Sequence, residues 1–236
     1  MTAEIILGNT DWPSNNVRFW RSRMDDGRWR WIPFDFDAAL GAVDKTGAHN
    51  TLVIGISKIP GQVPPWPAYL LRELLGNSRY RARFAGRFAM WLNTIFQPEQ
   101  VIAKIDVAEA ELFPGVERQA RRWGGARATY TTFYNVAQWK EHVEVLRTFA
   151  RNRPEHVWQH LARKFGTGTA TLRIAQQDPH RGTIRIGGIP VPNRDATGEG
   201  EPWKGRFLTG LPLEIIATPN TGYRLAGWDG LPGKAA

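Results

Sequence analysis

The sequence predicts an α+β fold with three consecutive parts: a β-hairpin, a helical region and a small β-rich module. Apolar and basic residues alternate over 17–21 and 28–32 around an Asp-Gly turn, which is typical of a hairpin. Apolar residues recur at helical spacing over 68–165, which indicates amphipathic helices. After Gly166, short alternating runs are separated by Gly, Pro, Asn and Asp, which is typical of short strands.

Composition narrows the class of protein. The chain has 236 residues, no Cys and a formal net charge of +9. This length allows a full hydrophobic core and two domains. A fold without Cys has no disulfides, and the sequence has no run of ~18 apolar residues that could span a membrane. The basic excess is spread along predicted helices, so we interpret it as solvated helix faces and expect no nucleic-acid partner.

Six helices are predicted within the helical region, because Gly and Pro interrupt the apolar periodicity. Two of these interruptions are the prolines Pro114 and Pro154. The expected helices run over 68–75, 80–95, 98–112, 116–123, 136–149 and 154–165.

Four oxygen-bearing side chains flank the predicted hairpin. Asp11 and Asn16 precede its first strand, and Asp35 and Asp37 follow its second. Because a hairpin returns the chain to its start, we expect the two pairs to converge at one end. Two carboxylates that end an apolar strand repel each other and are costly to desolvate without a cation. Hard oxygen donors, with no Cys or His nearby, favour magnesium.

The spacing of these residues is that used in protein-kinase phosphoryl transfer. There, an Asp accepts the proton of the substrate hydroxyl, an Asn five residues later ligates magnesium, and a second Asp bridges metal and phosphates. Asp11 and Asn16 have the first spacing, and Asp35 stands where the second Asp is expected. The alternative is an ordinary turn, in which the Asp side chain bonds the backbone two residues on.

The residues of 9–16 (NTDWPSNN) and 27–37 (GRWRWIPFDFD), closed by Gly41, resemble the core signature of the CotH kinase family. These are atypical protein kinases named for a bacterial spore-coat protein, and the resemblance continues to about Gly166. It implies a kinase-like C-terminal helical lobe with a catalytic β-hairpin. It also implies phosphate transfer, dependent on ATP and on Mg²⁺ or Mn²⁺, to Ser or Thr hydroxyls of a coat or surface protein.

Roles for individual residues follow from their positions in this motif. The resemblance implies that Asp11 is the catalytic base, that Asn16 and Asp35 bind the cofactor, and that Asn16, Asp35 and Asp37 bind the metal. It leaves open which of Asp35 and Asp37 is the main ligand. A kinase also has an N-terminal lobe with a phosphate-pairing Lys. Because the residues before Asp11 are expected to be a helix ended by Gly8, we expect this chain to be an incomplete kinase.

The remaining residues predict a second domain, so that the expected division is 1–166 and 167–236. Its predicted strands are 171–174, 183–186, 206–208, 213–217 and 223–226. The final stretch resembles β-repeat modules at the ends of bacterial surface proteins, which implies an extracellular, cell-envelope or spore-coat setting. The alternative function is a non-catalytic coat or envelope scaffold that binds partners through this module.

Overall fold

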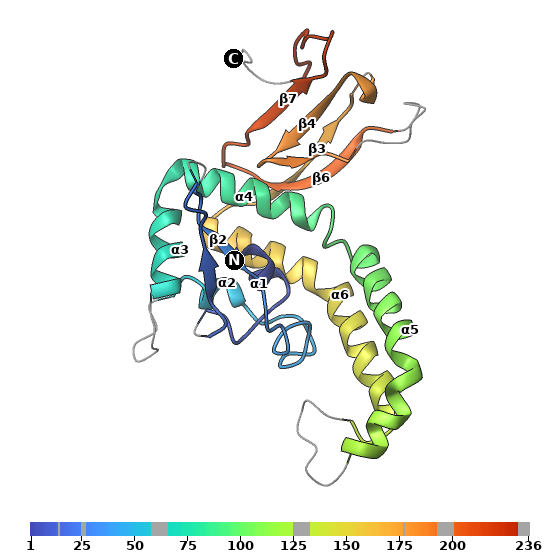
Figure 1. The fold of residues 1–236 in the computed structure, drawn as a ribbon. Helices are drawn as coiled ribbons and strands as arrows, with labels where there is room; N and C mark the ends of the chain where they lie inside the picture. Colours follow the sequence, from blue (N-terminus) through green and yellow to red (C-terminus); the bar gives the residue numbers. More distant parts are fainter. Residues whose placement is uncertain are drawn as a thin grey trace. The chain divides into compact units, whose positions relative to one another are not determined.

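The fold is α+β, as predicted, and it divides into two compact units (Figure 1). The first unit comprises Met1–Asn77 with Thr94–Thr167, and the second comprises Ser78–Asn93 with Gly168–Ala236. The computed structural model describes residues 1–13, 15–24, 27–57, 66–124, 133–176, 178–192 and 201–230.

The first unit begins with a short helix and the predicted hairpin. Helix α1 (Thr2–Ile6) is followed by Gly8, whose positive φ of 68° suits glycine and turns the chain. Strand β1 (Arg18–Trp20) pairs antiparallel with β2 (Arg30–Ile32), with Phe19 opposite Trp31. Gly27 N–H donates to the Met24 carbonyl at 2.9 Å. Asp25 and Asp26 of the predicted turn lie outside the described residues.

The stretch after Gly41 contains a short helix, α2 (Thr51–Ile54). The Asn50 side chain caps it by accepting a hydrogen bond from the Val53 N–H at 3.1 Å. Thr51 and Leu52 are buried, so the helix forms because it packs into the core. Helix α3 (Trp66–Gly76) follows.

Two long helices, α5 (Pro98–Trp123) and α6 (Val136–Phe165), lie side by side in the first unit (Figure 1). The predicted breaks at Pro114 and Pro154 are wrong, because both helices continue through them. An internal proline removes one helix hydrogen bond. Buried residues lie on both sides of each proline, among them Ile105 and Val116 in α5 and Ala150 and Val157 in α6, and their burial offsets this loss. The shared core consists of Ile105, Val143 and Ala150, flanked by Val101, Ile102, Trp139 and Leu146.

The second unit combines α4 (Ser78–Leu92) with the C-terminal strands. Strand β3 (Thr169–Ile174) pairs with β6 (Trp203–Leu208). The other sheet has the order β5-β4-β7. Helix α4 packs against β6 and β4. The bounds of the remaining elements are Gly182–Ile186 for β4, Ile189–Pro190 for β5, Ile215–Pro219 for β7, and Pro179–Arg181 for the 3-10 helix η1.

The strand predicted over 223–226 is wrong. These residues are exposed and have no regular structure. Alternation of apolar and polar residues stabilises a strand only where a neighbouring strand supplies hydrogen bonds. In the described part of the chain, no strand pairs with this segment.

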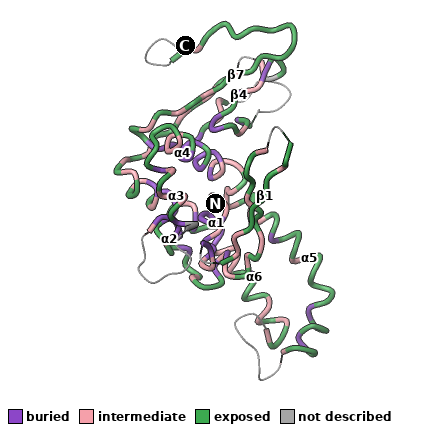
Figure 2. Tube along the Cα trace, turned by 60° about the vertical axis from the view of Figure 1, so that its left-hand side comes forward, coloured by how far each residue is buried: buried purple, intermediate pink, exposed green. Residues whose placement is uncertain are grey.

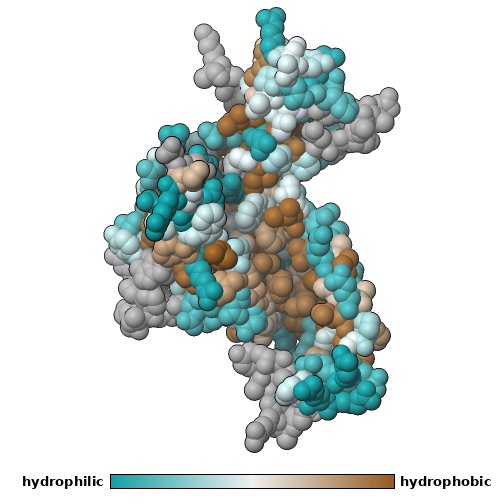
Figure 3. Space-filling view, in the orientation of Figure 1, coloured by the Kyte–Doolittle hydropathy of each residue, from teal (hydrophilic) through white to brown (hydrophobic). Residues whose placement is uncertain are grey.

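Buried residues gather around α1 and α2 in the first unit and along α4 in the second, whereas the hairpin is largely exposed (Figure 2). In the view of Figure 3, hydrophobic residues collect over α6 and the adjoining side of α5. No helix within the described ranges is long and apolar enough to cross a membrane.

Candidate functional site

The loop that leads into β1 carries Asp11, whose carboxylate is held by two amides. Asn15 Nδ2 donates to Asp11 Oδ1 at 3.2 Å, and Asn16 Nδ2 donates to Asp11 Oδ2 at 2.9 Å. An ionised carboxylate can only accept, so Asn16 must present its Nδ2 to Asp11. The Asn16 Oδ1, which lies on the other branch of the planar amide, therefore points away from Asp11. This oxygen is the atom of Asn16 that can bind a cation.

Asn9 joins the loop before the hairpin to the loop after it. Its side chain is completely buried, with 0% exposed. Its Oδ1 accepts from the Asp11 N–H at 3.1 Å, and its Nδ2 donates to the Asp35 carbonyl at 3.4 Å. The same Nδ2 donates to Oε2 of Glu4 at 3.0 Å. One buried amide thus brings the backbones at Asp11 and Asp35 together.

Further hydrogen bonds fix the loop after β2. The N–H and the hydroxyl of Thr10 both donate to the Ala38 carbonyl at 3.3 Å. The N–H of Leu40 donates to the Leu7 carbonyl at 2.8 Å. These bonds attach the Asp35–Asp37 loop to the segment just before Asp11.

Three residues around the site have backbones in the left-handed region. Their φ angles are 57° for Asn16, 58° for Asp35 and 53° for Leu40. Asn and Asp tolerate this region better than other L residues, because their short polar side chains can bond locally. Such conformations persist where the surrounding structure imposes them, and they cluster at functional sites. Asn16 and Asp35 are both among the residues that the sequence predicts to be functional.

Asp35 and Asp37 follow β2, and both side chains are exposed. The structure connects Asp35 to Asp11 through backbone groups rather than through the carboxylates. Over the described ranges, no three or more His, Cys, Asp or Glu side chains form a group that could hold a metal ion. The donors at the hairpin base therefore do not form a ready-made carboxylate cage.

This donor set suits a magnesium ion that arrives with a nucleotide. Mg²⁺ is usually held by one or two carboxylates together with phosphate oxygens and waters, rather than by a cage made entirely of protein groups. Asp11, Asn16, Asp35 and Asp37 supply hard oxygen donors alone. The chemistry of these groups fits Mg²⁺ or Mn²⁺ with nucleotide phosphates and does not fit a soft-ligand metal.

Arg153 of α6 anchors the segments beneath the site. It is 2% exposed, and its guanidinium stacks on Phe149 at 5.6 Å. Burial lowers the pKa of Arg153 to about 10, although the charge of Asp44 raises it. It donates five hydrogen bonds: to the carbonyls of Ile5 (2.6 Å), Ile6 (2.9 Å), Gly47 (2.7 Å) and His49 (2.6 Å), and to Oγ1 of Thr51 (2.8 Å).

Sequence patterns did not identify Asn9, Glu4 and Arg153 as residues of the site. The sequence did contain a signal for Asn9. An Asn side chain often accepts a hydrogen bond from the backbone N–H two residues further on, which here is the N–H of Asp11. Burial raises the pKa of Glu4, while the hydrogen bond from Asn9 lowers it. Nothing in the sequence distinguishes Arg153 from the exposed arginines of α6, because its acceptors come from distant segments.

His156 and His160 on α6 are four residues apart, which is the spacing of two metal ligands on one helix face. Burial, together with the charges of Arg153, His156 and Arg163, lowers the pKa of His160 to about 4. The surroundings therefore favour a neutral His160. These histidines also belong to no group of metal-binding residues in the described part of the chain.

Comparison with known proteins adds one finding. The family model described as "CotH kinase protein" matches residues 1–157. No curated protein and no solved structure was found to match the chain. The matched range contains the hairpin, both loops of the candidate site and Arg153, and it ends before β3.

Proposed function

The chain belongs to the CotH kinase family, and from this premise we propose that the loops at the base of its hairpin form a phosphotransferase site. A kinase-like function follows from the family. The finer proposal is transfer of the γ-phosphoryl group of ATP to Ser or Thr hydroxyls of a protein. The observation that carries it is the buried Asn9 amide, which bonds the backbone at both Asp11 and Asp35.

Asp11 is proposed as the general base. Hydrogen bonds from Asn15 and Asn16 orient its carboxylate and leave each oxygen a further lone pair. A substrate hydroxyl that reaches one of these oxygens would pass its proton to Asp11 as the oxygen attacks phosphorus.

Asn16, Asp35 and Asp37 are proposed to hold the divalent cation, Mg²⁺ or Mn²⁺, together with the nucleotide phosphates. When bound, such an ion neutralises charge on the phosphates. Asn16 offers the amide oxygen that points away from Asp11, and the exposed carboxylates of Asp35 and Asp37 lie on the adjoining loop. Asp35 and Asp37 both remain candidates for the main ligand.

The substrate is proposed to be a coat or surface protein, in an extracellular, cell-envelope or spore-coat setting. Residues 167–236 are proposed to form a module of the kind that bacterial surface proteins carry. The alternating strands β3, β4, β6 and β7 support this proposal.

The test measures phosphate transfer and nucleotide binding in the longest natural form of the protein that contains this chain. Asp11→Asn should reduce transfer by about 10²-fold or more, because it removes the base, and should retain binding of ATP with Mg²⁺. Asp35→Asn and Asp37→Asn should weaken that binding, and the larger loss identifies the main ligand. Asp229→Asn, an exposed Asp of the second unit, is the matched control.

Undiminished transfer by Asp11→Asn would contradict the assignment of the base. If calorimetry detected no binding of ATP with either Mg²⁺ or Mn²⁺, the result would favour the alternative of a non-catalytic scaffold.

A further inference from the structure

Helix α4 of the second unit carries a row of exposed arginines. Arg79, Arg83 and Arg87 follow one another at a spacing of four residues, so they lie along one side of the helix. All three side chains are exposed, whereas Phe84 and Phe88 of the same helix are buried. These three arginines are called here the α4 arginine row.

The charge of α4 differs from that of the other long helices. It contains four Arg and no Asp or Glu, whereas α3, α5 and α6 all contain acidic residues. Arginines of α6 pair with such residues: Arg147 with Asp106 at 2.7 Å, and Arg151 with Glu144 at 2.8 Å. Within the described ranges, no carboxylate forms an ion pair with the α4 arginine row.

The α4 arginine row does not help the helix to form. Like charges four residues apart repel each other, and the row contains two such pairs, Arg79 with Arg83 and Arg83 with Arg87. Arg79 also lies in the first turn of α4, where the helix dipole favours acidic side chains. Departures from local preference of this kind are expected at functional positions. An anionic partner would relieve both unfavourable terms.

The backbone beneath the α4 arginine row is held by close packing. The turn between β4 and β5 approaches α4 so closely that a Cβ at Gly187 would lie 2.6 Å from the backbone N of Arg87. Gly187 has a φ of 57° and no side chain, which permits this approach. On the buried side, the rings of Phe84 and Phe88 lie 5.5 Å apart. The arginines therefore extend from a rigid element, which lowers the entropy lost on binding.

The spacing of the α4 arginine row indicates the shape of its partner. A helix rises about 1.5 Å per residue, so successive members of the row start about 6 Å apart. In an extended peptide, side chains at every second position point to the same side and are about 7 Å apart. Acidic residues at alternate positions can therefore meet successive arginines. Each guanidinium can bind a carboxylate through two parallel hydrogen bonds.

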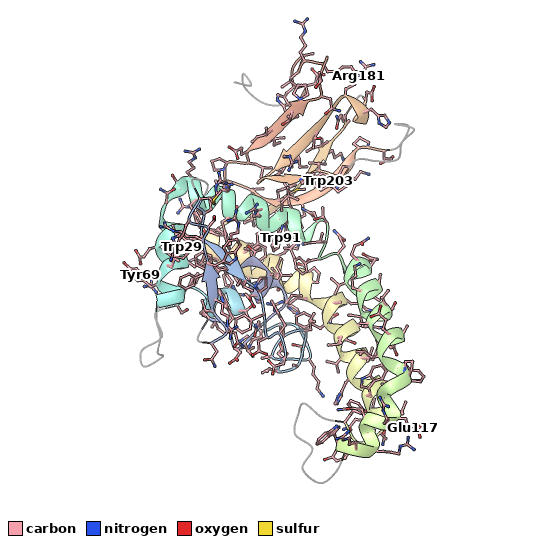
Figure 4. All side chains as sticks on the ribbon, viewed as in Figure 1. Trp29, Tyr69, Trp91, Glu117, Arg181 and Trp203 are labelled. Atoms are coloured by element: carbon pink, nitrogen blue, oxygen red, sulfur yellow. The ribbon has the colours of Figure 1, made fainter. Side chains whose placement is uncertain are left out.

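Single-stranded nucleic acid is the other polyanion to consider. Proteins that bind it combine basic groups with aromatic side chains on which the bases stack. Every residue of α4 is described, and none of its aromatic side chains is among the exposed ones. Trp91, which follows the row at the same spacing and is labelled in Figure 4, is half-buried. The α4 arginine row therefore fits an acidic peptide better than a nucleic acid.

We propose that the α4 arginine row binds an extended acidic segment of another protein. Carboxylates at alternate positions of the segment bind Arg79, Arg83 and Arg87. This binding involves none of the residues proposed for phosphate transfer, so it goes beyond the proposed function and is tested without nucleotide.

The test follows the fluorescence anisotropy of a labelled peptide of alternating Glu and Thr, with the full chain at low salt. A twin peptide with Lys at every Glu position is the charge control. We expect the acidic peptide to bind and the Lys twin to fail. Arg83→Gln should weaken binding by about tenfold or more, because it removes the central charged contact. Arg118→Gln, the same change at an exposed position of α5, should weaken it by less than about twofold.

A second variant separates binding from folding. Arg83→Glu should abolish binding and leave the melting temperature unchanged or higher, because an acidic side chain here attracts both Arg79 and Arg87. A lower melting temperature in Arg83→Glu would show that the row serves the fold, and would overturn the proposal. No binding of the acidic peptide, equal binding of the Lys twin, equal losses from Arg118→Gln and Arg83→Gln, or tighter binding of a single-stranded oligonucleotide would also overturn it.

Discussion

The base of the hairpin and its strands are held by different forces. At the base, Asn9 and Arg153 are buried and bonded to several backbone groups each. Along the strands, Arg18, Arg21 and Arg30 stack on aromatic rings at an exposed surface. A buried hydrogen bond enforces one geometry, because breaking it leaves an unsatisfied polar group. Exposed stacking contributes less and tolerates movement. The chain therefore concentrates its rigid contacts at the loops that carry Asp11 and Asp35.

The largest effect should come from Arg153→Ala. The variant leaves four backbone carbonyls and a hydroxyl without their guanidinium partner, and we expect a loss of about 3–5 kcal/mol in the free energy of unfolding. Urea denaturation measures this loss. Arg151→Ala is the control, because Arg151 is an exposed residue that pairs with Glu144 on the same helix. A similar loss in both variants would contradict the anchoring role.

The next largest effect should come from Asn9→Ala. Removing the amide leaves the Asp11 N–H and the Asp35 carbonyl without this partner. We expect this to lower the free energy of unfolding by about 1–3 kcal/mol. Asn15→Ala is the control, since Asn15 is exposed and, among the described residues, bonds only Asp11. Hydrogen exchange of the amide of Asp11, read by NMR, should accelerate in Asn9→Ala and stay slow in Asn15→Ala. Slow exchange in both would show that Asn9 does not hold this loop.

A smaller effect should appear in the pH dependence of folding stability. The pKa of His160 is about 4 in the folded chain, below its ordinary value of 6.5, because burial and the charges of Arg153, His156 and Arg163 disfavour the protonated ring; a backbone hydrogen bond at Ala48 opposes this. Between these two values the unfolded chain binds more protons than the folded chain. Stability should therefore be fully present above about pH 6.5 and decline as pH falls toward 4.

His160→Gln tests this dependence, because Gln does not titrate. Denaturation midpoints measured over this pH range should fall less steeply in His160→Gln than in the original chain. His142→Gln, an exposed position on the same helix, should leave the slope unchanged. Identical slopes for all three proteins would assign the acid sensitivity to other groups.

The smallest effect should come from the exposed strands. Arg30→Ala removes one stacking contact with Trp20 and should cost about 0.5–1 kcal/mol. Arg122→Ala is the matched control on α5, where Arg122 stacks on Trp123 at 5.0 Å. Thermal denaturation should give similar small shifts for both. If Arg30→Ala lowered the free energy of unfolding as much as Asn9→Ala does, the base of the hairpin would not be held more rigidly than its strands.

Local patterns predicted much of this fold. The hairpin, α1 ended by Gly8, and the long amphipathic helices follow from periodicity and from turn residues within a few positions of each other. The helix breaks at Pro114 and Pro154 were wrong, since residues on both sides of each proline are buried, and burial is a long-range effect that outweighs a local penalty. The strand over 223–226 was wrong for the converse reason, because a favourable local pattern found no pairing strand among the described residues.

The candidate site was predictable to a similar extent. The motif drew attention to Asp11, Asn16, Asp35 and Asp37, and their roles stay predictions. What the sequence could not reveal is how the two loops are held. Asn9 and Arg153 hold the loops through hydrogen bonds to partners that lie far away in sequence. The sequence does not show whether a polar residue is buried or exposed, because burial is decided by the fold.

The hydrogen bonds between Asn93 and β6 in the second unit have a consequence for solubility. The N–H of Arg206 donates to Asn93 Oδ1 at 2.9 Å, and the carbonyl of Arg206 accepts from Asn93 Nδ2 at 2.8 Å. A side-chain amide here imitates the pairing that another strand would provide. Unpaired strand edges invite edge-to-edge association between molecules. By occupying both groups of Arg206, Asn93 protects β6 at this point against aggregation.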